Sequence, residues 1–487
     1  MIGNFNIRFM LRILGFVLII ESLFMMACSV VSFYYTEECG DTILTCSAVT
    51  LLCGIFLRIF GTEHIQKKTS KRESFLTVSL IWVLLSAFGM LPFYYSGVTP
   101  RWSDAFFETM SGFTTTGSTI LRHIDDVPKG LLLWRSITQW IGGIGIIVFA
   151  LLLLPMVSGN GVSLYNSEVT GISKDKFSPK IKQTASRLWI IYLSITALLI
   201  FLLSLGPMSL FDSVCHAFTT VSTGGLSTKQ ASIAYWNSAY VEYVISIFMF
   251  IGGINFTLIY FLFRGNFKKI LRDEEFKWYL LLFAIITLLV ACGLYSSGLV
   301  KGVETSFRTS LFQVISVMTS TGFSTADFTL WGVPYAMLMY LLMVFCASAG
   351  STSGGLKIVR MVILSKNAIN EFKRQVHPNA ILPVRLNGNV VSNEVVTKIL
   401  AFIFLYLTIL VLSFIVLSIT GMKFEESTSA AISCLSNVGP GLGSLASNGH
   451  FGDIPEAAKW YLSFLMLVGR LEIFTVLSLF MPAFWKR

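Results

Sequence analysis

Four short stretches of small, mostly polar residues, each ending in glycine, are the parts of this 487-residue chain best suited to chemistry. They cover 114–117, 221–224, 319–322 and 436–439. In a selectivity filter, backbone carbonyls of this kind replace the water shell of a cation. Glycine permits dihedral angles that a Cβ forbids, which leaves the carbonyls room to point inward. One such stretch would indicate only a turn, but four of them between hydrophobic segments predict four walls of one pore.

The backbone, more than the side chains, is expected to hold the ion. The residues that frame the four filter loops are Thr114, Gly117, Val221, Gly224, Thr319, Gly322, Ser436 and Gly439. The two residues before each glycine are the predicted metal-binding positions: Thr115, Thr116, Ser222, Thr223, Ser320, Thr321, Asn437 and Val438. Because these side chains vary and include a valine, backbone oxygens must do most of the coordination.

The composition is that of a membrane protein. The chain is 54% hydrophobic and 13% charged, whereas an ordinary soluble domain is about 25% charged. Many apolar runs reach the roughly 20 residues that span a bilayer, and no cleavage site follows the first of them. We therefore predict an all-α integral membrane fold with ten transmembrane helices. They cover 9–34, 42–60, 74–96, 133–157, 186–206, 238–264, 277–298, 332–363, 397–421 and 457–484.

Four shorter apolar stretches lie just before the glycine loops. They cover 101–113, 209–220, 306–318 and 425–435, and they have the length of pore helices that enter the membrane and return. From residue 74 onward, the order of span, pore helix, filter loop and span therefore occurs four times. The predicted divisions are two extra N-terminal helices (1–70) and four pore repeats at 71–160, 161–270, 271–390 and 391–487.

The distribution of basic residues predicts the orientation in the membrane. Ten spans put both termini on one side, and 26 of the 36 Lys and Arg residues fall on that side, which is therefore cytoplasmic. This bias explains the net charge of +10 without nucleic acid as a partner. The filter loops then open outward, where acidic residues either attract cations or form an ordinary solvated face. These residues are Glu37, Glu38, Asp104, Glu108, Asp125, Asp126, Asp212, Asp327, Glu425 and Glu426.

The eighth predicted span is too long and too rich in Gly and Ser to be one helix. A continuous helix over 332–363 would be about 50 Å long, compared with a hydrocarbon core of roughly 30 Å. Its centre reads ASAGSTSGG, which favours a break that forms a loop inside the membrane, below the filter. A passive kink is the alternative. The residues concerned are Ala347, Gly350, Ser351, Thr352, Ser353, Gly354 and Gly355.

Three polar residues inside apolar segments need separate interpretation. Arg470 lies in the last span, where a lone arginine is costly and usually functional. It either holds the intramembrane loop, lowers cation occupancy, or forms an ion pair for packing. Glu21 in the first span is left open, and His216 in the second pore helix is expected to be a packed, neutral side chain in preference to a metal ligand. The eight cysteines form no CxxC pair and predict neither disulfides nor zinc.

At these residues the sequence resembles the TrkH group of bacterial potassium-uptake proteins, within the Trk/Ktr/HKT superfamily. The matching segments include SGFTTTGS, CHAFTTVSTGG, SVMTSTGFSTADF, CLSNVGPGLG, QWIGGIG, FIGGINF, SAGSTSGGLK and GRLEIFT. The resemblance implies four pseudo-symmetric repeats around one ion path, a gate at the intramembrane loop, a homodimer, and a cytoplasmic nucleotide-binding ring (TrkA-like) that regulates transport. Glycine at all four filter positions favours potassium over sodium, although the fourth loop, SNVG, lacks the threonines of the others.

The resulting prediction is potassium uptake across the bacterial cytoplasmic (inner) membrane, with potassium bound in the filter and no organic cofactor. Membrane lipid surrounds the spans, and the basic inner loop 365–395 is either solvated or docks the regulatory ring. The alternative is a secondary transporter, coupled to protons or sodium, with alternating access. No His and Glu metal cluster, GxSxG motif or paired intramembrane acids appear, so the chain is not expected to be an enzyme.

Overall fold

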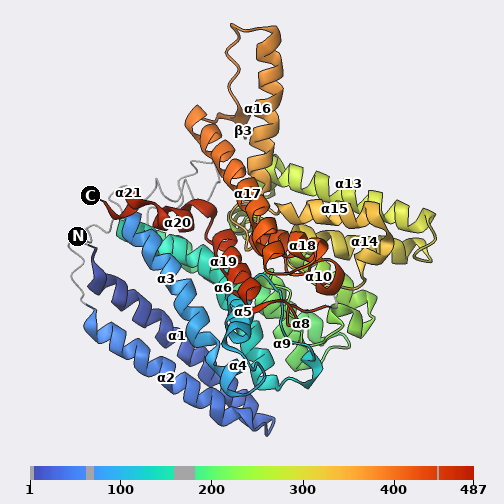
Figure 1. Ribbon diagram of the computed structural model, residues 1–487. Helices are drawn as coiled ribbons and strands as arrows, with labels where there is room; N and C mark the ends of the chain where they lie inside the picture. The colour runs from blue at the N-terminus through green and yellow to red at the C-terminus, as the bar shows by residue number, and fades with distance from the viewer. Residues whose placement is uncertain (1–4, 62–70, 158–180, 447–448, 487) are drawn as a thin grey trace.

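Helices make up nearly all the regular structure of residues 5–61, 71–157, 181–446 and 449–486, which are the residues that the computed structural model describes. Figure 1 shows these helices packed against one another, with one helix, α16 (Ile358–Val376), projecting from the body. Strands in the described residues are limited to two pairs of two-residue segments. The predicted all-α class is therefore confirmed at the level of a predominantly helical protein.

The N-terminal helices α1 (Ile7–Tyr34) and α2 (Cys39–Phe60) form a hairpin along one flank of the molecule (Figure 1). The two helices approach closely at Gly15 and Gly54. A Cβ added to Gly15 would lie only 2.5 Å from the carbonyl oxygen of Gly54, so glycine is needed at this contact. Small residues at helix contacts let backbones pack this tightly in membranes. The hairpin packs on α3, α4 and α6 and contributes no residue to the glycine loops.

The rest of the chain repeats one order of elements: an outer helix, a short helix, a glycine loop and an inner helix. The first set is α3 (Lys71–Gly89) with α4 (Leu91–Tyr95), α5 (Trp102–Phe113) and α6 (Lys129–Val157). The second is α8 (Ile181–Ser204), α9 (Leu210–Val221), α10 (Ala239–Gly252) and α11 (Phe256–Phe263), followed by α12 (Phe267–Arg272). The third is α13 (Glu274–Ser296), α14 (Val303–Met318), α15 (Val333–Val344) and α16. The fourth is α17 (Asn393–Ile419), α18 (Phe424–Ser436), α19 (Glu456–Arg470) and α20 (Ile473–Leu477), before α21 (Pro482–Trp485).

The four short helices predicted before the glycine loops are present as α5, α9, α14 and α18, and their role as pore helices stays a prediction. Six helices in the described residues are long and apolar enough to cross a membrane, and two bent helix pairs bring the number to eight. The chain is therefore a multi-pass membrane protein, whereas the number of ten spans stays a prediction. The six are α1, α2, Arg72–Tyr95, Ser186–Ser204, α13 and α17.

Two predicted spans, 238–264 and 457–484, are not continuous helices, contrary to the prediction. α10 and α11 are bent by 107°, and α19 and α20 by 116°. The first bend follows Gly252 and Gly253, and the side chain of Asn255 caps α11 by accepting a hydrogen bond from Thr257 N at 2.9 Å. At the second bend, Glu472, the residue before α20, takes φ +62° and ψ 144°, a backbone conformation that is rare for residues other than glycine. Apolar residues flank both breaks closely, so the average hydrophobicity of each segment does not show that it bends.

The eighth span is interrupted between α15 and α16, over residues 345–357. Here β1 (Phe345–Cys346) pairs in parallel with β2 (Leu356–Lys357) and closes the intervening residues, 347–355, into a loop. α16 then continues beyond the predicted span end to Val376. A short hairpin of β3 (Arg385–Leu386) and β4 (Asn389–Val390) leads back to α17.

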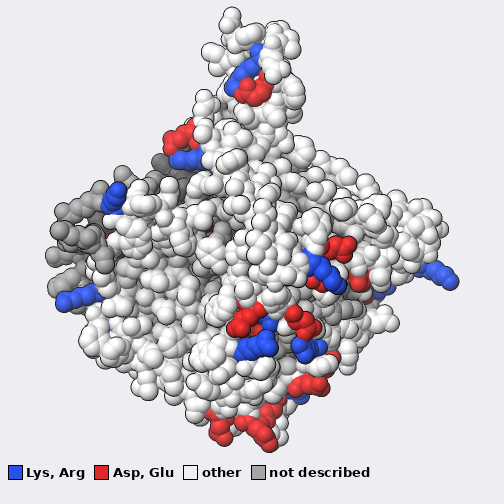
Figure 2. Space-filling model, in the orientation of Figure 1, with Lys and Arg blue, Asp and Glu red and all other residues white. Residues whose placement is uncertain are grey.

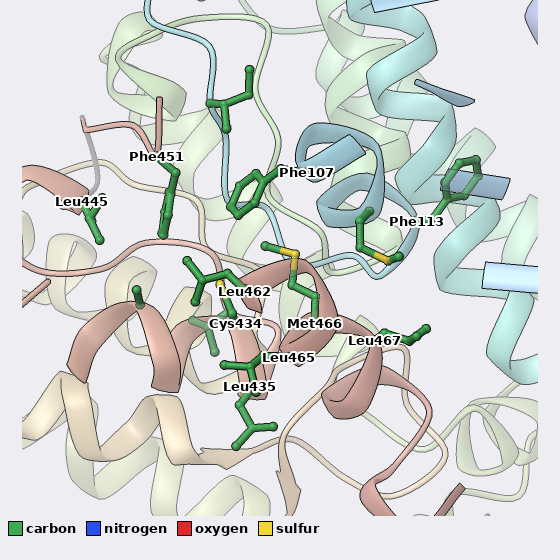
Figure 3. Close-up of a cluster of buried hydrophobic side chains, with 14 of the residues drawn as sticks. Phe107, Phe113, Cys434, Leu435, Leu445, Phe451, Leu462, Leu465, Met466 and Leu467 are labelled. Atoms are coloured by element: carbon green, nitrogen blue, oxygen red, sulfur yellow. The ribbon is translucent and has the colours of Figure 1, made fainter. Parts of the chain in front are cut away.

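Apolar side chains from α5, α18, α19 and the segment between α18 and α19 fill the space between α5 and α18. The rings of Phe107 and Phe451 lie with centroids 5.5 Å apart, and both side chains are buried. Close packing of buried side chains of this kind holds the helices that carry the glycine loops in fixed positions. Figure 3 labels Phe107, Phe113, Cys434, Leu435, Leu445, Phe451, Leu462, Leu465, Met466 and Leu467 in this cluster.

Charged side chains are sparse on the face shown in Figure 2. Acidic side chains gather at the lower edge of this view, where α1 joins α2, at the end opposite the projecting α16 (Figures 1 and 2). The surface between these ends is mostly uncharged, apart from small groups of side chains of both signs (Figure 2), and its uncharged part is suited to contact with lipid.

Candidate functional site

Each pore helix runs into its glycine loop through a residue in the left-handed conformation. These residues are Thr115, Thr223, Ser320 and Asn437, with φ between 52° and 55°. Two residues later, each loop has a glycine with positive φ: Gly117, Gly225, Gly322 and Gly439. Positive φ is uncommon for residues other than glycine, so four occurrences at one position establish the structural register of the loops.

This register corrects the sequence alignment of the second loop by one residue. Gly225, not Gly224, corresponds to Gly117, and Gly224 corresponds to Thr116. Backbone hydrogen bonds agree, because Thr116 N bonds to Ser111 O at 2.9 Å and Gly224 N bonds to Thr219 O at 2.8 Å. The third and fourth loops repeat the bond, from Thr321 N to Ser316 O and from Val438 N to Ser433 O.

The correction changes which residues of the second loop are candidate ligands. Thr223 and Gly224 now occupy the two positions before the glycine, in place of Ser222 and Thr223. Val221 is the last residue of α9, and Ser222 takes the place that Thr114 has in the first loop. Because two glycines are adjacent in this loop, the sequence alone does not say which of them has the left-handed conformation.

The four loops meet in a ring. A Cβ on Gly117 would lie 2.2 Å from Gly224 O, and one on Gly225 would lie 1.8 Å from Thr321 O. In the same way, a Cβ on Gly322 would lie 2.2 Å from Val438 O, and one on Gly439 would lie 2.8 Å from Thr116 O. All four glycines line one cavity. Each loop thus presents a carbonyl to the glycine of the loop before it, and the first loop presents one to the glycine of the fourth. A side chain at any of the four glycines would collide with backbone.

Side chains in the loops mainly brace one another. The hydroxyls of Thr114 and Thr116 lie 2.8 Å apart, and those of Thr319 and Thr321 lie 2.7 Å apart. In the fourth loop, the Asn437 amide donates to the Thr116 hydroxyl at 2.8 Å and to Met466 O at 3.0 Å. Asn437 therefore ties the fourth loop to the first, which the sequence did not indicate for the loop that departs most from the others.

The intramembrane loop, residues 347–355, is bonded directly to the ends of the pore helices. Ser353 Oγ donates to Thr319 O at 2.7 Å, and Gly354 N donates to Ser320 Oγ at 3.0 Å. The hydroxyl of Thr352 lies 3.1 Å from that of Thr223. These bonds involve the second and third glycine loops, so residues 347–355 lie against the ring that the four glycine loops form.

Four anchors hold this loop in place. Arg470 donates to Thr352 O at 2.6 Å and to Gly142 O at 2.8 Å. Glu275 on α13 accepts a hydrogen bond from Ala349 N at 2.6 Å, and Phe256 N on α11 donates to Gly350 O at 3.1 Å. The ammonium of Lys357 bonds to the carbonyls of Ser353 and Gly354. Of these anchors, the sequence singled out only Arg470.

Arg470 is buried, and in the described part of the chain it forms no ion pair. The nearby Glu472 instead pairs with Arg360 of α16 at 2.6 Å, and that guanidinium also lies 3.8 Å from the ring centroid of Phe402. The alternative of an ion pair between Arg470 and an acidic neighbour is therefore wrong, because the bend at Glu472 directs its carboxylate toward α16.

Two acids assigned to a negative outer face are buried in ion pairs. Arg135 Nε lies 2.6 Å from Glu108, and Lys459 Nζ lies 2.5 Å from Asp104. Both interpretations of Asp104 and Glu108, attraction of cations from solution and an ordinary solvated face, are wrong, because each carboxylate is buried and its charge is compensated inside the protein. Their partners lie on other helices, Arg135 on α6, 27 residues from Glu108, and Lys459 on α19, 355 residues from Asp104, so local sequence does not indicate either pair.

The buried polar residues His216 and Glu21 differ in whether their side-chain atoms have hydrogen-bond partners. His216 is packed as predicted: Nδ1 lies 2.8 Å from Asp212 O, and Nε2 lies 2.9 Å from Ser227 Oγ. Within the described residues, no group of three or more His, Cys, Asp or Glu side chains is placed to bind a metal. Glu21 is buried, and neither carboxylate oxygen has a hydrogen-bond partner among those same residues.

Comparison with known proteins agrees with this architecture. The TrkH family model, described as "Cation transport protein", matches residues 42–487. The Trk system potassium uptake protein TrkH of Vibrio parahaemolyticus is 36% identical over 485 residues, covering 98% of this chain and 99% of that protein. TrkH of Escherichia coli K12 is also 36% identical, covering 99% of this chain and all of that protein.

A solved structure shows the same fold. The crystal structure of the potassium transporter TrkH from V. parahaemolyticus superposes with a TM-score of 0.90 at 34% identity, covering 98% of this chain and 99% of that chain. The family consists of cation transporters and not of enzymes. This chain belongs to the TrkH family of cation transport proteins.

Proposed function

We propose that this protein conducts potassium into the cell through the ring of four filter loops, with backbone carbonyls as the ion ligands. The observation that carries the proposal is the ring itself, in which four loops share one alternation of backbone conformation and each faces the next. Potassium is the ion named for the relatives in V. parahaemolyticus and E. coli. Glycine at 117, 225, 322 and 439 supports the same ion.

The intramembrane loop is the gate in this proposal. It bonds to the inner ends of the second and third filter loops and is anchored by Arg470 from another repeat. An ion leaving the filter toward the cytoplasm would meet these bonded residues, so conduction requires that the loop move. The anchors come from α11, α13 and α19, which means that movement of any of these helices would change how firmly the gate is held.

The projecting α16 and the following hairpin are the proposed docking site for the cytoplasmic regulatory ring. Phe372, Val376 and Ile381 are exposed there beside the basic residues Lys373 and Arg374. The names of the relatives refer to a Trk system, in which this protein would be one component. Substitution of Phe372 and Ile381 by Asp should abolish co-purification with a TrkA-like ring and leave flux without the ring unchanged. Retained co-purification would contradict this assignment.

The orientation, membrane and oligomeric state complete the proposal. α16 projects into the cytoplasm, the end rich in acidic residues faces outward, and both termini are cytoplasmic, in the bacterial inner membrane. A homodimer is proposed on the family resemblance alone. Size-exclusion chromatography with light scattering in detergent tests it, and a monomeric mass would refute it.

A coupled secondary transporter is the second candidate. The bends of 107° and 116° favour it, because broken helices in mid-membrane also build the sites of alternating-access carriers. The two mechanisms differ in what drives the flux, since a pore needs only the gradient of the ion it conducts. Four loops around one cavity support the pore more directly than the bends support a carrier.

Ion flux in liposomes tests the proposal. The purified protein is reconstituted and flux of potassium, rubidium, sodium and lithium is compared at a fixed voltage, with no gradient of any second ion. We expect potassium and rubidium to pass more readily than sodium and lithium. Flux that requires a proton or sodium gradient would show coupled transport, and equal flux of all four ions would refute a selective filter.

A further inference from the structure

The second filter loop lacks a side chain where the other three loops have one. Gly224 corresponds to Thr116, Thr321 and Val438. Its backbone does not demand glycine, because Gly224 is not among the residues with positive φ. The following residue, Gly225, already supplies the left-handed position. Another cause must therefore account for glycine at 224.

The side chain of Gln139 on α6 occupies the space that a Cβ at 224 would need. Such a Cβ would lie 2.3 Å from Cδ of Gln139 and 2.4 Å from its Oε1. Gln139 is fully buried. Its Nε2 donates to Gly224 O at 2.6 Å, and its Oε1 accepts from Leu226 N at 3.1 Å. The amide thus bonds to the backbone on both sides of Gly225.

Arg135, one helical turn before Gln139, continues this contact along the second loop. Its Nη1 donates to Ser227 O at 2.7 Å, and its Nε bonds to Glu108 at 2.6 Å. Glu108 in turn accepts from Ile120 N, in the first loop, at 2.8 Å. α6 therefore braces the second loop at three backbone positions, Gly224, Leu226 and Ser227, and links it to the first loop.

We propose that Gln139 is a positioning residue that determines ion specificity, supplied by α6 to the second filter loop in place of a side chain at 224. The inference rests on the proposed filter. Gly224 O is the carbonyl that faces Gly117 in the ring, and the bond from Gln139 fixes its direction. Two adjacent glycines give this loop more backbone freedom than the others have, so it needs an external brace.

Selectivity measured in liposomes tests the role of the Gln139 amide. Gln139→Met keeps the length of the side chain but removes both hydrogen bonds, and Gln139→Ala removes the bulk as well. Two lost hydrogen bonds predict a fall of about tenfold in the potassium-to-sodium flux ratio of either variant. Ser136→Ala is the matched control, because this buried hydroxyl bonds to Leu132 O within its own helix, and the ratio should not change. An unchanged ratio in a folded Gln139→Met protein overturns the proposal.

A double variant separates positioning from general damage to the fold. Gly224→Thr alone should abolish potassium flux, because its side chain collides with Gln139. In the Gln139→Ala background, the same substitution should restore flux and selectivity, since it gives the second loop the residue type of Thr116 and Thr321. A double variant that folds but conducts no better than Gly224→Thr alone would also overturn the proposal.

The proposed filter and this inference fail in different ways. Gly117→Ser disturbs the ring without touching Gln139. If Gly117→Ser changes the flux ratio and the Gln139 variants do not, the filter stands and the positioning role is refuted. If neither Gly117→Ser nor the Gln139 variants change the ratio, the filter itself is refuted.

Discussion

Replacing Arg470 by alanine should open the pore. The side chain makes two charge-assisted hydrogen bonds, of which the one to Thr352 O, at 2.6 Å, restrains the intramembrane loop directly. The other, to Gly142 O at 2.8 Å, fixes the guanidinium on α6. A hydrogen bond to a charged group contributes about 1.5–3 kcal/mol. Each 1.4 kcal/mol is about a factor of ten in an equilibrium, so the open-to-closed ratio of the loop should rise roughly 10- to 100-fold.

Potassium flux per protein molecule, measured in liposomes without a regulatory partner, checks this expectation. Arg470→Ala should raise basal flux until the open state dominates, at a folded yield close to that of the parent. Arg470→Lys is the informative control, because lysine keeps the charge but loses the planar fork. If the planar guanidinium anchors the loop, the flux of the lysine variant should lie between the flux of the parent and that of the alanine variant. If the charge merely repels potassium, the lysine variant should behave like the parent.

Unchanged flux in Arg470→Ala at normal folded yield would refute the reasoning. It would mean that Glu275, Lys357 and the hydroxyl bonds to the filter hold the loop without Arg470. A variant that only loses yield, with no gain in flux per molecule, would assign Arg470 to stability instead.

Three other changes give distinct outcomes. Gly117→Ser should lower the potassium-to-sodium flux ratio in liposomes, because its side chain collides with Gly224 O; an equal ratio in mutant and parent would contradict the filter. Deletion of Ser348–Ser353 should raise basal flux, because it removes the hydroxyls bonded beneath the filter; a folded deletion that conducts no more than the parent would count against a gate. Lys459→Met leaves Asp104 buried without its partner and should destabilise the protein by roughly 3–5 kcal/mol; thermal unfolding in detergent should show a lower Tm, and an unchanged Tm would be inconsistent with a buried pair.

The sequence determined the elements that depend on local composition. Apolar runs predicted the long helices, and shorter runs before each glycine loop predicted α5, α9, α14 and α18. The run of Gly and Ser at 347–355 predicted the interruption between α15 and α16 for the same reason, since these residues are poor at continuing a helix. Each of these features is decided within about 20 consecutive residues, where periodicity and propensity are informative.

The sequence could not supply the bends in the sixth and tenth spans. Each break interrupts its apolar segment only briefly, with GGIN in the first and GRLE in the second, and the second depends on a positive φ at Glu472, whose carboxylate is held by Arg360, 112 residues away in the chain. A single positive φ leaves no trace in a hydrophobic pattern. The tertiary contact, and not the local propensity, decides where the helix ends.

The tertiary structure alone decided how the four loops fit together. The adjacent glycines at 224 and 225 are equivalent in the sequence, and only the contact of Gly225 with Thr321 O and the presence of Gln139 beside Gly224 distinguish them. The burial of Glu108 against Arg135 is of the same kind. Local sequence fixes which backbone conformations are accessible, whereas packing between distant segments selects one of them, because buried polar groups must find partners wherever the fold places them.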